Sequence, residues 1–139
     1  MRTQSNSPIF VIGAGRSGTT VIFDLFANHD DLGFFTNFDD VLCATPFFGL
    51  SRPIFQNRFW NRLGKRKTWK TANDYSSPLP RKTEAYRFWT RYTVEEFGRS
   101  YLWTKKPSSD NIERFQSRVD RLLRLQNKKV FAAKITGPG

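Results

Sequence analysis

A glycine-rich segment near the amino terminus, Gly13-Ala-Gly-Arg-Ser-Gly-Thr-Thr20, has the residue types and spacing of an anion-binding loop. Its three glycines can adopt backbone conformations that other residues avoid, so that successive N–H groups can turn toward one concave site. A helix that starts there adds positive potential, and the guanidinium of Arg16 offers planar donors for phosphate or sulfate oxygens. The segment therefore predicts an oxyanion site.

Two predicted elements position this loop. The apolar run Pro8–Ile12 precedes it and indicates a short strand, and residues 21–28 follow it with apolar side chains on one helical face. The order strand, loop, helix is therefore expected. A glycine turn that merely joins the two elements is the structural alternative, but it explains neither Arg16 nor the pair Thr19-Thr20.

The loop has the spacing GxxxxG of the nucleoside-triphosphate P-loop, but Thr19 stands where the phosphate-binding lysine of that motif belongs. This difference disfavours ATP or GTP hydrolysis. Residues 16–20, Arg-Ser-Gly-Thr-Thr, resemble instead the 5′-phosphosulfate loop of the sulfotransferase family, in which PxRSGTT or PKSGTT occurs; Gly13-Ala-Gly15 replaces the proline-containing lead-in of many members. The resemblance implies binding of 3′-phosphoadenosine 5′-phosphosulfate (PAPS). The cofactor-binding residues would be Gly15, Arg16, Ser17, Gly18, Thr19 and Thr20.

A second strand is predicted at Leu32–Phe35, which together with the first strand and helix indicates a βαβ unit of a parallel sheet. Ligands bind at the carboxyl ends of such strands, so residues 36–40 are expected beside the loop. Asp39 or Asp40 could there take a proton from an acceptor hydroxyl. A helix N-cap or an exposed loop pair is the structural alternative.

The middle of the chain, residues 41–82, mixes aromatic and basic side chains without regular periodicity. This composition fits local packing, a lid over an acceptor pocket, or a surface that stacks and neutralises nucleic acid. A helix is predicted from Pro80, continuing over 92–102. Pro80, Glu84, Ala85 and Trp89 match a Pro-x-x-x-Glu-Ala-x-x-x-Trp pattern of some bacterial and animal sulfotransferases. Glu84 is thus a second candidate base, or a first-turn acid that complements the helix dipole.

The carboxyl-terminal part predicts one long helix and one strand. Asp110 and Glu113 suggest a capping box for a helix over 111–126, whose arginines would face solvent. Its expected buried stripe is Ile112, Phe115, Val119, Leu122 and Leu123. Residues 128–135 predict a strand. The resemblance implies that Lys134 on this strand approaches the phosphosulfate; an exposed strand-end lysine is the alternative.

Composition limits the possible partners and location. A net charge of +11 over 139 residues implies anionic partners, such as a nucleotide cofactor, an acidic glycan or lipid, or nucleic acid. The single cysteine, Cys43, excludes an internal disulfide and is expected to be a small buried residue. The only histidine, His29, falls at the far end of the first helix and is not expected in catalysis. No apolar run is long enough for a membrane span or a signal peptide, so a cytoplasmic location is expected.

These observations predict an α/β domain with a P-loop-like, three-layer fold around a central parallel sheet. It would comprise a phosphosulfate-binding unit (8–40), an aromatic and basic lid with helices (41–109), and a helix with the third strand (110–139). The resemblance implies a further strand with an Arg and a later Ser that grip the cofactor 3′-phosphate. Because the pattern stops after the third strand, we expect the amino-terminal portion of such a domain, inactive alone.

The activity that the resemblance implies is transfer of a sulfuryl group from PAPS to a hydroxyl or amine of a carbohydrate, lipid or small metabolite. Arg16 and Lys134 would neutralise charge on the bridging oxygen, and Glu84, Asp39 or Asp40 would deprotonate the acceptor, with no metal. One alternative is a P-loop kinase or NTPase that takes its lysine from elsewhere. The other is a basic nucleic-acid-binding module, although nucleic acid is not the expected partner.

Overall fold

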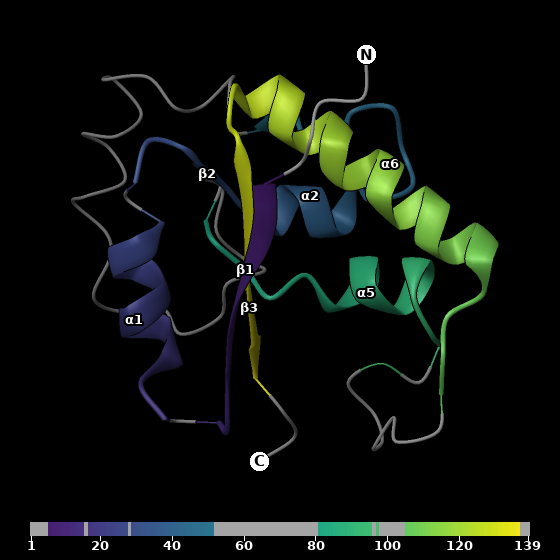
Figure 1. Ribbon diagram of the computed structural model, residues 1–139. Helices are drawn as coiled ribbons and strands as arrows, with labels where there is room; N and C mark the ends of the chain where they lie inside the picture. Colours follow the sequence, from purple (N-terminus) through teal and green to yellow (C-terminus); the bar gives the residue numbers. More distant parts are fainter. Residues whose placement is uncertain are drawn as a thin grey trace.

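The computed structural model describes residues 6–15, 17–27, 29–51, 81–95, 97 and 105–136 (Figure 1). Its elements, in chain order, are β1 (Asn6–Gly13), α1 (Thr19–Phe26), β2 (Leu32–Gly33), α2 (Asn37–Val41), α5 (Tyr86–Tyr92), α6 (Ser109–Gln126) and β3 (Val130–Thr136). Most of the predicted lid lies outside the described residues. In the part that is described, no helix is both long and apolar enough to cross a membrane.

The three strands form a parallel sheet in the order β1-β3-β2. Leu32 of β2 pairs with Val130 at one end of β3, and Gly13 of β1 pairs with Thr136 at the other end. The predicted α/β class with a parallel sheet is confirmed. The two strands predicted as one βαβ unit are not neighbours, however, because β3 lies between them, and β2 is only two residues long.

Helices cover both faces of this sheet: α1 lies on one side, and α2, α5 and α6 lie on the other (Figure 1). As expected for a central parallel strand covered on both faces, β3 has three consecutive buried residues, Phe131, Ala132 and Ala133. The alanines leave room for the covering elements to approach the sheet closely. The larger of the two clusters of buried side chains lies on the α5 and α6 side.

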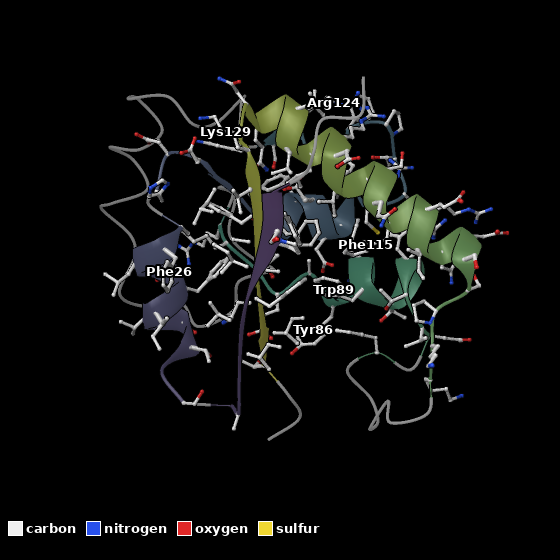
Figure 2. All side chains as sticks on the ribbon, viewed as in Figure 1. Phe26, Tyr86, Trp89, Phe115, Arg124 and Lys129 are labelled. Carbon is white, nitrogen blue, oxygen red and sulfur yellow. The ribbon has the colours of Figure 1, made fainter. Side chains whose placement is uncertain are left out.

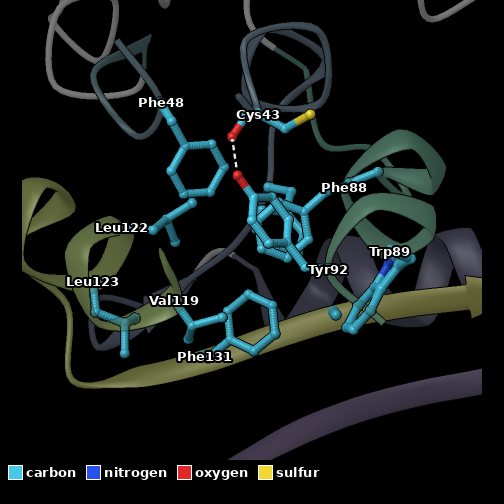
Figure 3. Close-up of a cluster of buried hydrophobic side chains, with 12 residues drawn as sticks. Cys43, Phe48, Phe88, Trp89, Tyr92, Val119, Leu122, Leu123 and Phe131 are labelled. Carbon is cyan, nitrogen blue, oxygen red and sulfur yellow. Dashed lines mark hydrogen bonds between the residues drawn. The ribbon is translucent and has the colours of Figure 1, made fainter. Parts of the chain in front are cut away.

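This main core is aromatic (Figure 3). The rings of Phe48 and Phe88 stack with centroids 5.3 Å apart and planes 11° apart, and both side chains are fully buried. The hydroxyl of Tyr92 donates to the carbonyl oxygen of Cys43 at 2.9 Å, which gives this buried phenol its partner (Figure 3). Cys43 is buried, as predicted, and its burial raises the pKa of the thiol.

Helix α5 is shorter than predicted at both ends. Residues 81–83 run alongside residues 35–37: Asn37 N donates to the Arg81 carbonyl at 2.9 Å and Thr83 N donates to the Phe35 carbonyl at 3.2 Å. These contacts hold the segment extended, and Ala85 follows with a φ of 54°. The helix therefore starts at Tyr86 rather than near Pro80, and it ends at Tyr92 instead of continuing toward Leu102.

Helix α6 forms where predicted, but its cap is different. The side chain of Ser108 accepts a hydrogen bond from Asn111 N at 3.2 Å and is the N-cap, so the predicted Asp110–Glu113 capping box is wrong. Val119, Leu122 and Leu123 are buried as predicted, whereas Ile112 is 43% exposed near the start of the helix. Two of the arginines expected in solvent, Arg118 and Arg121, donate to backbone carbonyls of residues 45 and 46.

A capping box does form, at the start of α2. Thr36 is the N-cap, and its backbone N–H and hydroxyl donate to Asp39 Oδ2 at 2.9 and 2.8 Å. The other carboxylate oxygen accepts from Gly49 N at 2.9 Å and Ser51 Oγ at 3.3 Å. Burial raises the pKa of Asp39, and these hydrogen bonds offset only part of that effect. The Asp39 side chain therefore links residues 49–51 to α2 through hydrogen bonds.

Asp39→Asn should lower the free energy of unfolding by about 1–3 kcal/mol, because the amide NH₂ would face hydrogen-bond donors in a buried site. Chemical denaturation near pH 7 measures this difference. Asp120→Asn, which changes an exposed acid on α6, is the matched control and should shift stability by less than about 0.5 kcal/mol. Equal stabilities of the two variants would contradict the structural role of Asp39.

Candidate anion-binding site

The loop between β1 and α1 is built around two glycines. Gly18 is the N-cap of α1 and has a φ of 80°, in the left-handed region that glycine favours. Gly13 ends β1, and a Cβ added there would lie 2.6 Å from Thr19 Cγ2 and 2.7 Å from Ser17 Oγ. Glycine at this position thus lets the loop fold back over the end of the strand. Arg16 lies outside the described residues, and its guanidinium contact stays a prediction.

The amino-terminal end of α1 is open. In the part of the chain that the structure describes, no side chain caps this helix and no acidic residue lies in its first turn. The amides of Val21 and Ile22 already bond to the Gly18 carbonyl, at 3.0 and 3.2 Å. The amides before them belong to the unsatisfied group at the start of any helix, where the dipole favours an anion.

The loop side chains divide into buried and exposed ones. Thr19, at the position of the P-loop lysine, is buried, and its methyl group lies against Gly13. Ser17 and Thr20 are exposed, so their hydroxyl groups can meet a ligand. Thr19 therefore supports the loop, while Ser17 and Thr20 are the side chains that can bind.

Lys134 of β3 brings a positive charge to this end of α1. Its ammonium nitrogen lies 3.0 Å from Thr20 Oγ1 and 2.7 Å from Glu84 Oε1. The side chain of Lys134 is 14% exposed and that of Glu84 17%. The exposed strand-end alternative for Lys134 is thus wrong, because the charge lies in a partly buried network at the loop.

Glu84 is the centre of this network. Its second oxygen, Oε2, accepts a hydrogen bond from Thr136 Oγ1 at 2.5 Å, and Tyr86 OH donates to the Thr136 carbonyl at 2.6 Å (Figure 2 labels Tyr86). Burial raises the pKa of Glu84, but the hydrogen bonds from Lys134 and Thr136, the nearby Tyr86 hydroxyl and the charge of Lys134 outweigh it, and the net pKa is lowered. Glu84 is therefore ionised at neutral pH.

This geometry changes the interpretation of Glu84. It precedes α5, which has no acid in its first turn, so the helix-dipole alternative is wrong. Each carboxylate oxygen already accepts a hydrogen bond, and the lowered pKa makes the group a weak base. In this arrangement Glu84 balances and orients the Lys134 ammonium.

The other two candidate bases do not join the network. Asp39 is 1% exposed and its carboxylate is bonded to residues 36, 49 and 51. Asp40 is fully buried, and its Oδ1 accepts from Phe88 N at 3.1 Å. Both acids are buried within α2, whose N-cap is Thr36, so the structural alternative of an N-cap or an exposed loop pair is wrong as well.

Two residues of the network, Tyr86 and Thr136, were not among the predicted site residues. Thr136 follows Lys134 by two positions, and alternate residues of a strand share a face, so this spacing could have indicated it. No comparable sequence signal indicates Tyr86, because its position depends on the extended segment before α5.

Comparison of the chain with family models, with curated proteins and with solved structures finds no match in any of the three.

Glu84→Gln should lower stability at pH 7 by about 1–3 kcal/mol, because Lys134 loses a charged partner in a partly buried position. A lowered folded-state pKa stabilises the protein above the unfolded-state pKa, near 4.5, and this contribution is lost as pH falls toward the folded-state value. The stability gap between the wild type and the variant should therefore narrow below pH 4.5. Chemical denaturation at several pH values measures it.

Asp24→Asn is the control for this experiment. Asp24 pairs with Lys82 at 3.0 Å, but the Asp24 side chain is 55% exposed. Removing its charge should therefore change the free energy of unfolding little at any pH. A Glu84→Gln gap that stays constant from pH 7 to well below 4.5 would contradict the ionised network.

Proposed function

We propose that this chain is part of a sulfotransferase that moves a sulfuryl group from PAPS to a hydroxyl or amine of a carbohydrate, lipid or small metabolite. The observation that carries the proposal is the contact between the Lys134 ammonium and the Thr20 hydroxyl, beside the uncapped start of α1. Helix amides, exposed hydroxyl groups and a fixed cation together suit a phosphate or sulfate group.

The position of Lys134 also bears on the choice between PAPS and a nucleoside triphosphate. In a triphosphate P-loop, the hydroxyl at the position of Thr20 binds Mg²⁺. Here that hydroxyl accepts a hydrogen bond from an ammonium group, so a positive charge built into the chain stands where the metal would bind. Sulfuryl transfer needs no metal. A lysine in place of Mg²⁺ therefore favours a sulfotransferase over a kinase or NTPase.

In the proposed reaction PAPS supplies the sulfuryl group, and this chain supplies binding and charge. The first amides of α1 and the hydroxyls of Ser17 and Thr20 would hold the phosphosulfate end, with Arg16 in the same loop. Lys134 would neutralise charge that grows on the bridging oxygen, which is the largest contribution expected of such a site. Glu84 keeps Lys134 in place, and it could take the acceptor proton only where the acceptor displaces Thr136 from Oε2.

The test is a binding comparison of adenosine 3′,5′-bisphosphate with ATP, each in EDTA and in Mg²⁺, followed through ligand-induced shifts of backbone amides. Adenosine 3′,5′-bisphosphate should bind equally tightly in EDTA and in Mg²⁺, because the Lys134 ammonium supplies the positive charge beside Thr20. Lys134→Met should weaken the binding of adenosine 3′,5′-bisphosphate by about tenfold or more. Lys129→Met, which changes the residue just before the other end of β3 (Figure 2), is the matched control and should leave this affinity unchanged.

Two outcomes would contradict this proposal, and each would support a different function. Tighter binding of ATP that depends strictly on Mg²⁺ would identify a kinase or NTPase. Binding of an oligonucleotide that falls steeply with salt and is insensitive to Lys134→Met would identify a nucleic-acid-binding module.

A further inference from the structure

A second cationic site lies on the other side of the sheet from α1, between α5 and α6 (Figure 1). It is a cavity of about 720 Å³, within the usual size range of small-molecule sites. Helix α5 contributes Arg91 and Tyr92, and α6 contributes Glu113, Arg114, Ser117 and Arg118. We call this cavity the arginine pocket.

The charges in this pocket do not cancel. Three guanidinium groups face one carboxylate, that of Glu113. Among the described residues, none of the three arginines lies within 4.0 Å of a carboxylate oxygen. Arg91 and Arg114 are exposed at the pocket, and neither donates to a protein acceptor in that part of the chain. The residues that line the pocket thus carry a net charge of about +2.

One of the three arginines is held in position. Arg118 is half-buried, and its Nη1 donates to the Thr45 carbonyl at 3.3 Å. Its guanidinium carbon lies 5.9 Å from the centre of the Phe48 ring and 5.8 Å from that of Tyr92, at cation–π distance from both. A guanidinium has five N–H donors, and within the described residues only Nη1 donates to the protein, which leaves further donors for a ligand. The fixed group would lose little conformational entropy on binding.

We propose that the arginine pocket binds a small molecule that carries at least two phosphate or sulfate groups. A guanidinium can bind two oxygens of such a group through paired N–H donors, and a ligand with two anionic groups can engage Arg118 together with Arg91 or Arg114. The hydroxyl of Ser117 adds a further donor. Because the pocket and the α1 loop lie on opposite sides of the sheet, this ligand is separate from the one proposed for the loop.

The experiment is a titration with pyrophosphate at about 0.15 M ionic strength, which limits binding by overall charge. Backbone amide shifts of Ser117 and Arg118 report on the pocket, and those of Gly18 and Thr20 report separately on the loop. The Ser117 and Arg118 shifts should saturate. Arg91→Ala/Arg114→Ala should weaken this binding at least tenfold while thermal unfolding stays close to that of the wild type, because both side chains are exposed.

The matched control is Lys106→Ala/Arg124→Ala, which removes the same charge from exposed residues that do not line the pocket; Figure 2 labels Arg124. It should change the affinity at Ser117 and Arg118 by less than twofold. Absence of saturable shifts at these amides would overturn the proposal, and so would equal weakening by both double variants. Neither result depends on whether the loop binds a nucleotide, since the loop amides are followed independently.

Discussion

The ammonium of Lys134, held between the carboxylate of Glu84 and the hydroxyl of Thr20, connects three parts of the chain that are far apart in sequence. Thr20 belongs to the first turn of α1, Glu84 to the extended segment before α5, and Lys134 to the last strand. A half-buried cation needs such partners, because burial without them costs free energy. The interaction therefore links the anion-binding loop to the helices on the opposite face of the sheet.

This meeting point depends on the central position of β3. Because β3 lies between β1 and β2, its carboxyl end comes beside the end of β1, where Gly13 pairs with Thr136. Lys134 and Thr136 occupy alternate positions there and contact the same carboxylate. The buried alanines of β3 let helices pack on both faces, so the strand brings its lysine to the loop while completing the core.

The sequence predicted the elements whose signals are local. The strand before the loop is a continuous apolar run, helix α6 has clear hydrophobic periodicity, and the glycine at position 18 marks the start of α1. Helix α1 forms where predicted, but its expected apolar face is not buried: Val21 is 65% and Leu25 73% exposed, and Phe23 is buried instead. Lys134 could be placed at the loop because the carboxyl ends of parallel strands share one edge. The α/β class followed from the order of these elements.

Other features depend on tertiary contacts that a single sequence does not display. The start of α5 is set by pairing of residues 81–83 with 35–37, which overrides the helical pattern from Pro80. Asp39 has the residue type of a base, yet donors from residues 49 and 51 make it a buried structural acid. The sequence leaves Glu84 as a candidate base or a first-turn acid, and only the positions of Lys134 and Thr136 show that its oxygens are engaged.

In the proposed function, the first amides of α1, next to Lys134, hold a sulfated or phosphorylated nucleotide. The most direct measurement is a structure of the chain with adenosine 3′,5′-bisphosphate, by crystallography or by intermolecular NMR contacts. We expect the 5′-phosphate against the amides of Gly18 to Thr20, with the Lys134 ammonium within hydrogen-bonding distance. A nucleotide bound elsewhere, with the start of α1 in contact only with water and Lys134 unchanged on Glu84, would contradict it.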